Sequence, residues 1–422
     1  MTAADAHRTI ETVWKIEAPR LIAGLARMLH DVGQAEDLAQ EALVVALERW
    51  PRDGVPDNPG AWLMTTAKRR AIDLIRHNRM RDDKRTALGY ELEAEAMAHA
   101  PDQADALDDD IGDDLLRLIF VACHPVLGRD MQVALTLRML GGLTTPEIAR
   151  AFLVPEATVA QRIVRAKRTL AEKQVPFEVP RGAELAPRLA SVLEVVYLIF
   201  NEGYTATTGD DWARPALCED ALRLGRVLAG LAPREPEVHG LVALMEIQAS
   251  RLHARTAADG TPILLLDQDR TRWDRLLIRR GLASLERAER MGGADGNYAL
   301  QAAIAACHAR ALRARDTDWK RVALLYARLA EVAPSPVVQL NRAVAVSMAE
   351  GPQAGLALVD ALRDERALAS YHLLPSVRGD LLFKLGRLHE ARAEFERAAA
   401  LTGNTREAEL LRQRAEACTE DR

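Results

Sequence analysis

The sequence predicts an all-α protein, and three observations support this fold class. Alanine, leucine and arginine, which favour helices, dominate the chain, whereas alternating β-branched runs are scarce. Glycine and proline mostly stand between the apolar segments. The hydrophobic fraction of 49% supports well-filled cores, although only 4% of the residues are aromatic. A chain of 422 residues is too long for one core, and about three domains are expected.

The same composition excludes several classes of protein. No apolar run reaches membrane-spanning length, and Met1 to Arg20 lacks the apolar core of a signal peptide, so we expect a cytoplasmic protein without membrane contacts. The sequence contains no phosphate-binding loop, His-Glu-x-x-His motif or nucleophile elbow, so we expect no enzyme, catalytic residue or cofactor. The cysteines are too scattered for disulfides or a metal site and are expected to be thiols: Cys123, Cys218, Cys307 and Cys418.

The segment from Val13 to Trp50 predicts two helices, the second of which begins at Gln34. In this second helix, apolar residues at helical spacing form the inward stripe: Leu38, Ala42, Val45 and Ala46. The opposite face is polar and acidic: Asp37, Gln40, Glu41 and Glu48. Without further context, such a face is most often solvated surface.

A third helix, Ala61 to Arg85, follows a loop that spans Pro51 to Gly60. It carries three acidic residues against eight basic ones: Lys68, Arg69, Arg70, Arg76, Arg79, Arg81, Lys84 and Arg85. A helix this basic suits contacts with nucleic-acid phosphates. Trp62, near its start, is either a residue that stacks on an exposed base or a core residue.

The stretch from Glu91 to Asp114 has the opposite charge, with ten acidic residues and no lysine or arginine. Such a run predicts a flexible, self-repelling linker, and it could also shield the basic segments from each other. The segment from Leu115 to Met139 then predicts two helices around His124-Pro125.

The stretch from Leu143 to Leu170 predicts two short helices joined by a tight turn. Thr144 or Thr145 caps the first helix, Pro146 stands in its first turn, and Leu153-Val154-Pro155 ends it. The second helix buries one stripe: Val159, Ile163, Ala166 and Leu170. Its other faces are polar and basic: Thr158, Gln161, Arg162, Arg165 and Arg168. This pattern is typical of a helix-turn-helix that enters the DNA major groove, and the alternative is an ordinary helical hairpin.

The order of these elements resembles the core of an extracytoplasmic-function (ECF) sigma factor. The resemblance rests on the Asp37-Leu38-Ala39-Gln40-Glu41 helix, a Pro-Gly-Ala-Trp-Leu helix that ends in a basic run, a linker and a terminal helix-turn-helix. It covers roughly Ile10 to Lys173. The individual motifs are degenerate, whereas their order and spacing together are specific.

This resemblance implies partners, domains and roles. The partners are core RNA polymerase, on whose clamp helices Asp37, Gln40 and Glu41 would dock, and promoter DNA. The implied domains are region 2 at 10–85, the acidic linker at 86–114 and the region 4 helix-turn-helix at 115–173. The −10 element would be recognised and melted by Trp62, Lys68, Arg69, Arg70, Arg76 and Arg79. The −35 element would be read by Thr158, Gln161, Arg162, Arg165 and Arg168.

The chain continues beyond the point where most members of that family stop. Arg188 to Phe200 is apolar nearly all round and predicts a buried helix that ends at a glycine stop, Asn201-Glu202-Gly203-Tyr204. Ile263 to Leu266 predicts a short strand or a buried connection. The polar residues that follow suggest a metal or phosphate site or, as we favour, a loop salt-bridge network: Asp267, Asp269, Arg270 and Asp274. Three histidines isolated on helices are expected to be structural: His239, His253 and His308.

From Tyr298 onwards the sequence predicts helical pairs with a loose repeat. Units beginning at Ala323, Ala354 and Ala391 resemble tetratricopeptide repeats, whose period is about 34 residues. We therefore expect a helical extension at 187–285 and tetratricopeptide-like repeats at 286–422. The whole chain resembles the ECF subgroup with such an extension, which typically lacks an anti-sigma partner. The resemblance implies that the extension controls activity, through a regulatory protein or a ligand on the repeats.

The sequence therefore predicts a sigma factor for promoter recognition and transcription initiation, with a controlling C-terminal extension. One alternative is a helix-turn-helix transcriptional regulator whose helical repeat domain senses a ligand or protein. Another is a repeat scaffold with an incidental helix-turn-helix. The acidic docking helix and the basic melting helix discriminate between them, because a plain regulator needs neither.

Overall fold

The computed structural model describes residues 3–83, 107–205, 213–257 and 261–418, with side chains of 3–6, 78–83 and 107–111 left undescribed. In these ranges the chain forms eighteen α-helices, and its β-structure is one isolated bridge between Thr256 and Pro262. The predicted all-α class is confirmed. The helices separate into two compact units, Met1–Val195 and Val196–Arg422, and the boundary falls inside one helix.

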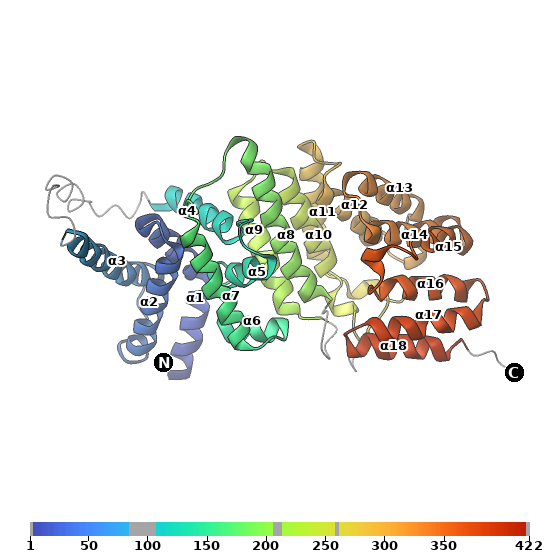
Figure 1. The fold of residues 1–422 in the computed structure, drawn as a ribbon, viewed down its shortest axis with the longest axis horizontal. Coiled ribbons are helices and arrows are strands. Elements are labelled where there is room, and N and C mark those ends of the chain that lie inside the picture. Colours follow the sequence, from blue (N-terminus) through green and yellow to red (C-terminus); the bar gives the residue numbers. More distant parts are fainter. Residues whose placement is uncertain (1–2, 84–106, 206–212, 258–260, 419–422) are drawn as a thin grey trace. The chain divides into compact units, whose positions relative to one another are not determined.

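The first unit holds seven helices and the start of an eighth (Figure 1). They are α1 (Ala3–Leu29), α2 (Val32–Asp53), α3 (Pro59–Asp83), α4 (Leu107–Ala122), α5 (Arg129–Met139), α6 (Thr145–Phe152), α7 (Glu156–Glu172) and α8 (Leu185–Tyr204). Helix α1 packs against α2, α3 and α4, while α5, α6 and α7 pack on one another. The helix α7 also contacts α2, so the helices on either side of the acidic segment form one unit.

Three predicted boundaries in this unit were wrong. Helix α1 begins at Ala3 rather than near Val13, and α2 continues through Pro51 to Asp53. Helix α4 begins at Leu107, inside the stretch predicted to be an acidic linker. The physical reason is that Asp114 is buried, with 2% exposure, and forms ion pairs with Arg27 and Arg117 instead of repelling its acidic neighbours in water. The rest of that linker, residues 86–106, lies outside the described residues.

The helix-turn-helix forms as its sequence predicts. Thr144 caps α6 through a capping box, in which its side chain accepts from the Glu147 amide while the Glu147 carboxylate accepts from the Thr144 amide. Leu153 ends α6 in the left-handed region at φ 51°, just before Pro155. In α7 the predicted inward residues are all buried: Val159, Ile163, Ala166 and Leu170. The second helix is therefore held by one apolar stripe and leaves its polar faces outside.

The second unit continues from α8 with ten further helices (Figure 1). They are α9 (Pro215–Leu231), α10 (Pro236–Ala249), α11 (Arg275–Arg290), α12 (Asn297–Arg310), α13 (Trp319–Val332), α14 (Pro336–Glu350), α15 (Pro352–Asp360), α16 (Leu373–Lys384), α17 (Leu388–Leu401) and α18 (Thr405–Glu416). Most of them pack on their neighbours in the chain, and α10 contacts both α11 and α12. This is the pattern of a stack of helical hairpins.

One prediction in the second unit was confirmed and another was wrong. Helix α8 ends at Tyr204, within the stretch where the sequence predicts its end. A Cβ on Gly203 would lie 2.7 Å from the Cys218 amide nitrogen, so this glycine permits close packing of α9. The Ile263–Leu266 segment is neither a strand nor a buried connection, because it forms turns and Leu264 and Leu266 are 44% and 40% exposed.

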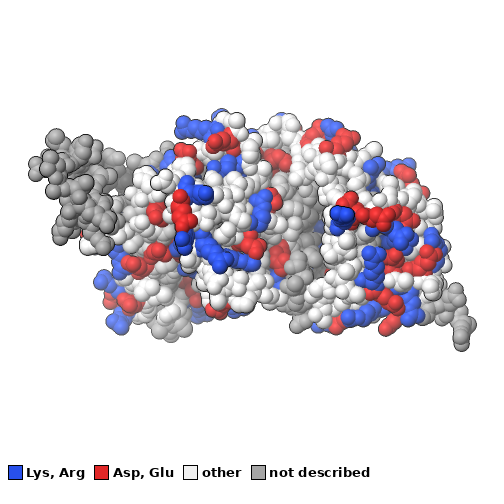
Figure 2. Space-filling model, viewed as in Figure 1, with Lys and Arg blue, Asp and Glu red and all other residues white. Residues whose placement is uncertain are grey.

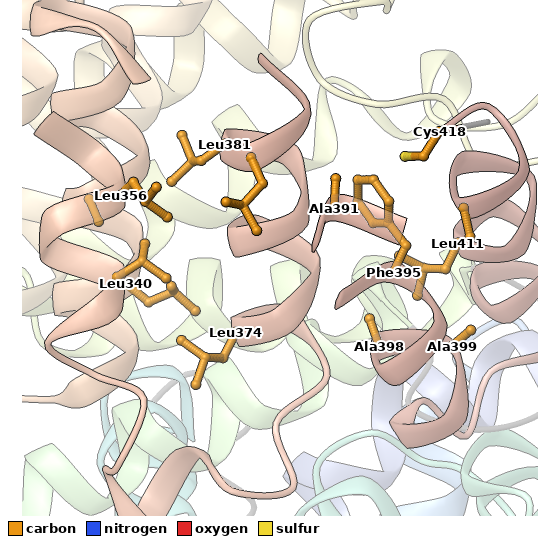
Figure 3. Packing of buried hydrophobic residues seen from close by; sticks show 14 of the residues in the cluster. Leu340, Leu356, Leu374, Leu381, Ala391, Phe395, Ala398, Ala399, Leu411 and Cys418 are labelled. Carbon is orange, nitrogen blue, oxygen red and sulfur yellow. The ribbon is translucent and has the colours of Figure 1, made fainter. Parts of the chain in front are cut away.

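The last helices share an aliphatic core with one aromatic ring at its centre (Figure 3). Phe395 of α17 is 1% exposed and lies with Leu411 of α18 on one side and α16 on the other. Gly379 permits this arrangement, since a Cβ at that position would come within 2.9 Å of the Phe395 ring. Small residues at helix crossings therefore set the spacing of this end of the unit.

Candidate functional site

The acidic face of α2 is exposed, and each of its two carboxylates has a basic partner. The side chains of Asp37 and Glu41 are 70% and 55% exposed, one helical turn apart, whereas Gln40 is half-buried. The Lys167 ammonium of α7 donates to Asp37 at 2.7 Å. Glu41 forms an ion pair with Arg70 of α3. The predicted docking residues therefore share one face, and part of that face is in contact with the helix-turn-helix.

The basic residues of α3 are distributed around an exposed helix. Arg69 and Arg76 are exposed, whereas Lys68 and Arg70 are half-buried. The Arg79 side chain lies outside the described residues. Exposed guanidinium groups on a helix surface are suited to nucleic-acid phosphates.

Trp62 forms a wall of an open hollow between α2 and α3, with a volume of about 570 Å³. Its ring stands edge-on to the buried ring of Trp50, with 5.4 Å between the centroids, and is itself half-buried. The hollow is also lined by Val45, Arg49, Ala61, Thr65, Thr66, Arg69 and Arg70. A fixed aromatic wall beside three arginines offers stacking and phosphate contacts to an unpaired base.

The exposed side of α7 presents a continuous stripe of four residues. Gln161, Arg165 and Arg168 are exposed, as the sequence predicts, and Val164 between them is 63% exposed. The other two predicted residues are less available: Thr158 is half-buried, and Arg162 forms an ion pair with Asp130 of α5. Arg168 is paired with Glu172 on its own helix.

Val164 was missed by the sequence analysis, although its signal was present. It is an apolar residue that falls outside the buried stripe of its helix. An exposed apolar side chain on a helix suited to the major groove can contact a thymine methyl group.

Glu36 was also missed, and it is the residue that joins the two candidate surfaces. Its side chain is 4% exposed and forms ion pairs with Arg138 of α5, at 2.9 Å, and with Lys167 of α7. Burial alone would lower the pKa of Lys167, but Glu36 and Asp37 outweigh it and raise the pKa, so the ammonium stays charged. We call these four residues the closing network: Glu36, Asp37, Arg138 and Lys167.

The first half of α8 belongs to the core of the helix-turn-helix domain. The Ser191 hydroxyl donates to the Cys123 carbonyl at 2.9 Å, and the Arg188 guanidinium donates to the Phe120 carbonyl at 3.1 Å. The buried Gln132 amide donates to the Cys123 and His124 carbonyls. Burial, partly offset by a hydrogen bond to Thr136 and by nearby arginines, raises the pKa of the Cys123 thiol to about 12. These bonds satisfy the carbonyls at the end of α4, where the helix leaves them unpaired.

The described residues were also compared with what a metal site or a membrane segment requires. In the ranges that the structure describes, no three potential ligands among His, Cys, Asp and Glu gather around one point. No described helix combines the length and the hydropathy that a membrane crossing requires. All four cysteines are buried free thiols, as predicted. Acidic and basic side chains are mixed over the face shown in Figure 2.

Three stretches of the chain match known families. Residues 14–81 match sigma-70 region 2, and residues 117–170 match sigma-70 region 4. Residues 188–289 match a family of unknown function, DUF6596. The matched stretches include the acidic face of α2, the Trp62 hollow and the exposed stripe of α7.

Several proteins are similar in sequence. The chain is 46% identical over 396 residues to an uncharacterized protein of Rhizobium meliloti (strain 1021), which covers 93% of this chain and 92% of that protein. It is 30% identical over 158 residues to the ECF RNA polymerase sigma factor SigK of Mycobacterium ulcerans (strain Agy99), covering 36% of this chain and 78% of SigK. It is 27% identical over 175 residues to the probable ECF RNA polymerase sigma factor SigI of Mycobacterium tuberculosis (strain ATCC 25618 / H37Rv), covering 41% of this chain and 58% of SigI. No solved structure matches the chain significantly.

The burial of Glu36 gives a testable stability difference. Glu36→Gln should lower the free energy of unfolding of the first unit by about 3–5 kcal/mol, because Arg138 and Lys167 lose the carboxylate that compensates their charge. Urea denaturation of the full chain, followed by circular dichroism, measures this change.

The neighbouring Asp37→Asn is the matched control, since Asp37 also bonds to Lys167 but is 70% exposed. Its effect should be about 0–1 kcal/mol. If Glu36→Gln lowers the free energy of unfolding no more than Asp37→Asn does, the closing network stabilises the unit no more than surface ion pairs do.

Proposed function

Because this chain belongs to the ECF family of RNA polymerase sigma factors, we propose that it binds core RNA polymerase in the cytoplasm and directs it to a specific set of promoters. The observation that carries the proposal is the combination of three surfaces in one unit. They are an acidic docking face, a basic helix beside an aromatic hollow, and an exposed helix-turn-helix stripe. A plain helix-turn-helix regulator needs only the third of these.

The acidic face of α2 is proposed to dock on the polymerase. Asp37 and Glu41 project from one helix face, and complementary charge both speeds encounter and fixes the register of such an interface. Since Asp37 is paired with Lys167, the polymerase has to compete with the recognition helix for this carboxylate. The described arrangement is therefore a closed one, and polymerase binding would favour its opening.

The Trp62 hollow is proposed to receive an unpaired base of the −10 element. The ring of Trp50 supports that of Trp62, which preorganises the aromatic wall. The exposed Arg69 and Arg76, with Lys68, Arg70 and Arg79, would hold the phosphates of the same strand. Stacking accepts any base, so the sequence preference of this site would come from contacts around the ring.

The stripe of α7 is proposed to read the −35 element. Gln161 and Arg165 can donate hydrogen bonds to base edges, and Val164 can contact a thymine methyl group. Arg168 is farther along the helix and is suited to phosphate. Arg162, bonded to Asp130, would position the helix and contribute less to base contacts.

The C-terminal extension is proposed to control this activity. Helix α8 supplies residues to both compact units, and its first half satisfies carbonyls of α4 in the helix-turn-helix domain. An event in the extension that shifts α8 would therefore alter the packing of the DNA-reading domain. The repeats of the extension, which we propose are tetratricopeptide-like, offer surfaces for a regulatory protein or a ligand.

Charge substitutions test the docking face. Reversal of Asp37 and Glu41 to lysine should weaken core polymerase binding by about tenfold or more, because both carboxylates would become repulsive. Lys167→Met should strengthen binding by up to about fivefold, since it frees Asp37. It also removes one of the two partners of the buried Glu36, so the folded fraction of this variant is checked by urea denaturation. Surface plasmon resonance on immobilised core polymerase measures both. Glu11→Lys, an exposed change on α1, is the control. Unchanged affinity of the double reversal would disprove the docking role.

Single substitutions test the reading of the −35 element. Arg165→Ala should reduce the free energy of promoter binding by about 1–3 kcal/mol and relax specificity at one base pair. Arg168→Ala should weaken binding to all DNA sequences alike and reduce the salt dependence of that binding. Arg162→Ala should have a smaller effect, because its guanidinium is bonded to Asp130. Holoenzyme binding to promoter variants at several salt concentrations separates these cases. If Arg165→Ala and Arg168→Ala both leave binding unchanged, this stripe does not face DNA.

Two truncations test the role of α8 and the extension. A fragment ending at Val195 keeps the bonds of Arg188 and Ser191 to α4, whereas one ending at Val179 loses them and should unfold at lower urea concentration. Both fragments should lose reporter transcription at matched protein levels, because the extension is required for regulated activity. Constitutive activity of the Val195 fragment would mean that the extension masks the core, and activity equal to the full chain would exclude any control.

A further inference from the structure

Three arginines converge inside the second unit. Arg251 and Arg255 follow the end of α10, and Arg270 lies in the irregular segment before α11. Each is more than nine-tenths buried, with exposures of 8%, 8% and 4%. Buried guanidinium groups are rare unless a carboxylate or another acceptor compensates their charge.

Aromatic rings surround these arginines. The Arg251 guanidinium lies 5.6 Å from the centroid of the Tyr204 ring and 5.8 Å from that of Trp273. Arg255 lies 3.6 Å from the Tyr204 ring, and Arg270 lies 5.0 Å from the Trp273 ring. Cation–π contacts favour these positions, but they contribute less than the cost of burying an uncompensated ion.

Part of this hydrogen-bonding capacity is used within the protein. Arg270 donates to the carbonyls of His308 and Ala311, both at 2.8 Å, and to the Thr317 hydroxyl. These bonds close the C-terminal end of α12. Arg255 donates to the Thr205 hydroxyl at 3.0 Å.

Other donors in the same place have no acceptor among the residues that the structure describes. Among the described residues, the buried side-chain atoms without a hydrogen-bond partner include three donors of this cluster: Arg251 Nε, Arg270 Nε and Trp273 Nε1. His308 Nδ1, which donates or accepts according to the tautomer, also lacks a partner. The Arg251 guanidinium has the Tyr204 and Trp273 rings as its neighbours. Such a concentration of unmet donors is unusual, because nearly all buried polar groups in native proteins are satisfied.

Among the described residues, Asp316 compensates Arg270 only in part, because burial and the neighbouring Arg251 still lower the pKa of Arg270. Asp267, Asp269 and Asp274 are exposed. Asp269 accepts from Thr271, and Asp274 caps α11 through the amides of Leu276 and Leu277. The electrostatic effect is visible at His308, whose pKa is lowered to about 3 by burial and by Arg251 and Arg270. The salt-bridge network and the metal site considered from the sequence are therefore not formed by these aspartates.

We propose that Arg251, Arg270 and Trp273 form a buried binding site for a small oxyanion, a phosphate or a carboxylate, in the C-terminal extension. The planar Arg251 guanidinium supplies paired donors that match the oxygen spacing of either anion. The Nε of Arg270 and the indole N–H of Trp273 supply one further donor each. The bound anion would compensate the buried positive charge and satisfy the unmet donors together. This inference concerns binding alone and does not depend on the proposed control of transcription.

A purely structural role of Arg251 predicts different results. If Arg251 is only a brace between Tyr204 and Trp273, its replacement should destabilise the protein, and anions should have no specific effect. If it belongs to an anion site, the uncompensated charge is unfavourable in anion-free buffer. Its replacement by a neutral side chain of similar length should then be neutral or stabilising there.

Calorimetric titration of the full chain tests the site, with inorganic phosphate in one arm and acetate in the other, at an ionic strength fixed with potassium chloride. The wild type should bind one equivalent of at least one anion saturably, with a rise in Tm. Arg251→Met should lose this binding and this rise, with an anion-free Tm at least equal to that of the wild type. Arg251→Lys keeps the charge without the planar donors and should bind about tenfold more weakly.

Arg279→Met, an exposed change on α11, is the matched control and should bind as the wild type does. Absence of saturable binding of both anions to the wild type would overturn the proposal. Undiminished binding to a folded Arg251→Met protein would overturn it equally. If Arg251→Met fails to fold, Arg251→Lys decides, since wild-type affinity in that variant would also contradict the site.

Discussion

One buried carboxylate holds the first unit in its described arrangement. Glu36 is almost inaccessible to solvent, and burial of a carboxylate is costly unless close basic partners compensate its charge. Arg138 and Lys167 supply them from α5 and α7, so the helix-turn-helix is tied to α2 by charge as well as by packing. Because Lys167 is held on the inner side of α7, the outer stripe around Arg165 stays exposed.

In the proposed docking, the same network makes Lys167 compete with the polymerase for one carboxylate. Lys167 also bonds to Asp37, which lies on the face proposed to bind polymerase. Breaking the bond between Lys167 and Asp37 costs little free energy, because Asp37 is well exposed. Separating Lys167 from Glu36 costs more, because that ion pair is buried. In the proposed docking, the polymerase therefore binds Asp37 first, and the helix-turn-helix separates from α2 only where the polymerase supplies further contacts. Helix α8 adds a second constraint, because its Ser191 and Arg188 complete the core beneath the helix-turn-helix.

Local chemistry made much of this fold predictable. The cap at Thr144, the proline at Pro155 and the apolar spacing of α7 each act within a few residues, and the structure follows them. Glu36 could not be predicted, because an acidic residue on an amphipathic helix indicates solvent unless its distant partners are known. The packing role of Gly203 could not be predicted for a similar reason, because the close approach of α9 is a tertiary contact. The buried guanidinium of Arg251 belongs to the same class, since helical periodicity does not reveal which polar residues meet in a core.

The central claim is that this chain confers promoter specificity on RNA polymerase, and transcription in vitro tests it most directly. Core polymerase would be mixed with a library of genomic DNA fragments, with and without the purified full-length protein, and the 5′ ends of the transcripts mapped. The account predicts a discrete set of new start sites that share spaced −10 and −35 sequences and that disappear with Arg165→Ala. Initiation that is identical with and without the protein, from a preparation shown to bind core polymerase, would contradict it.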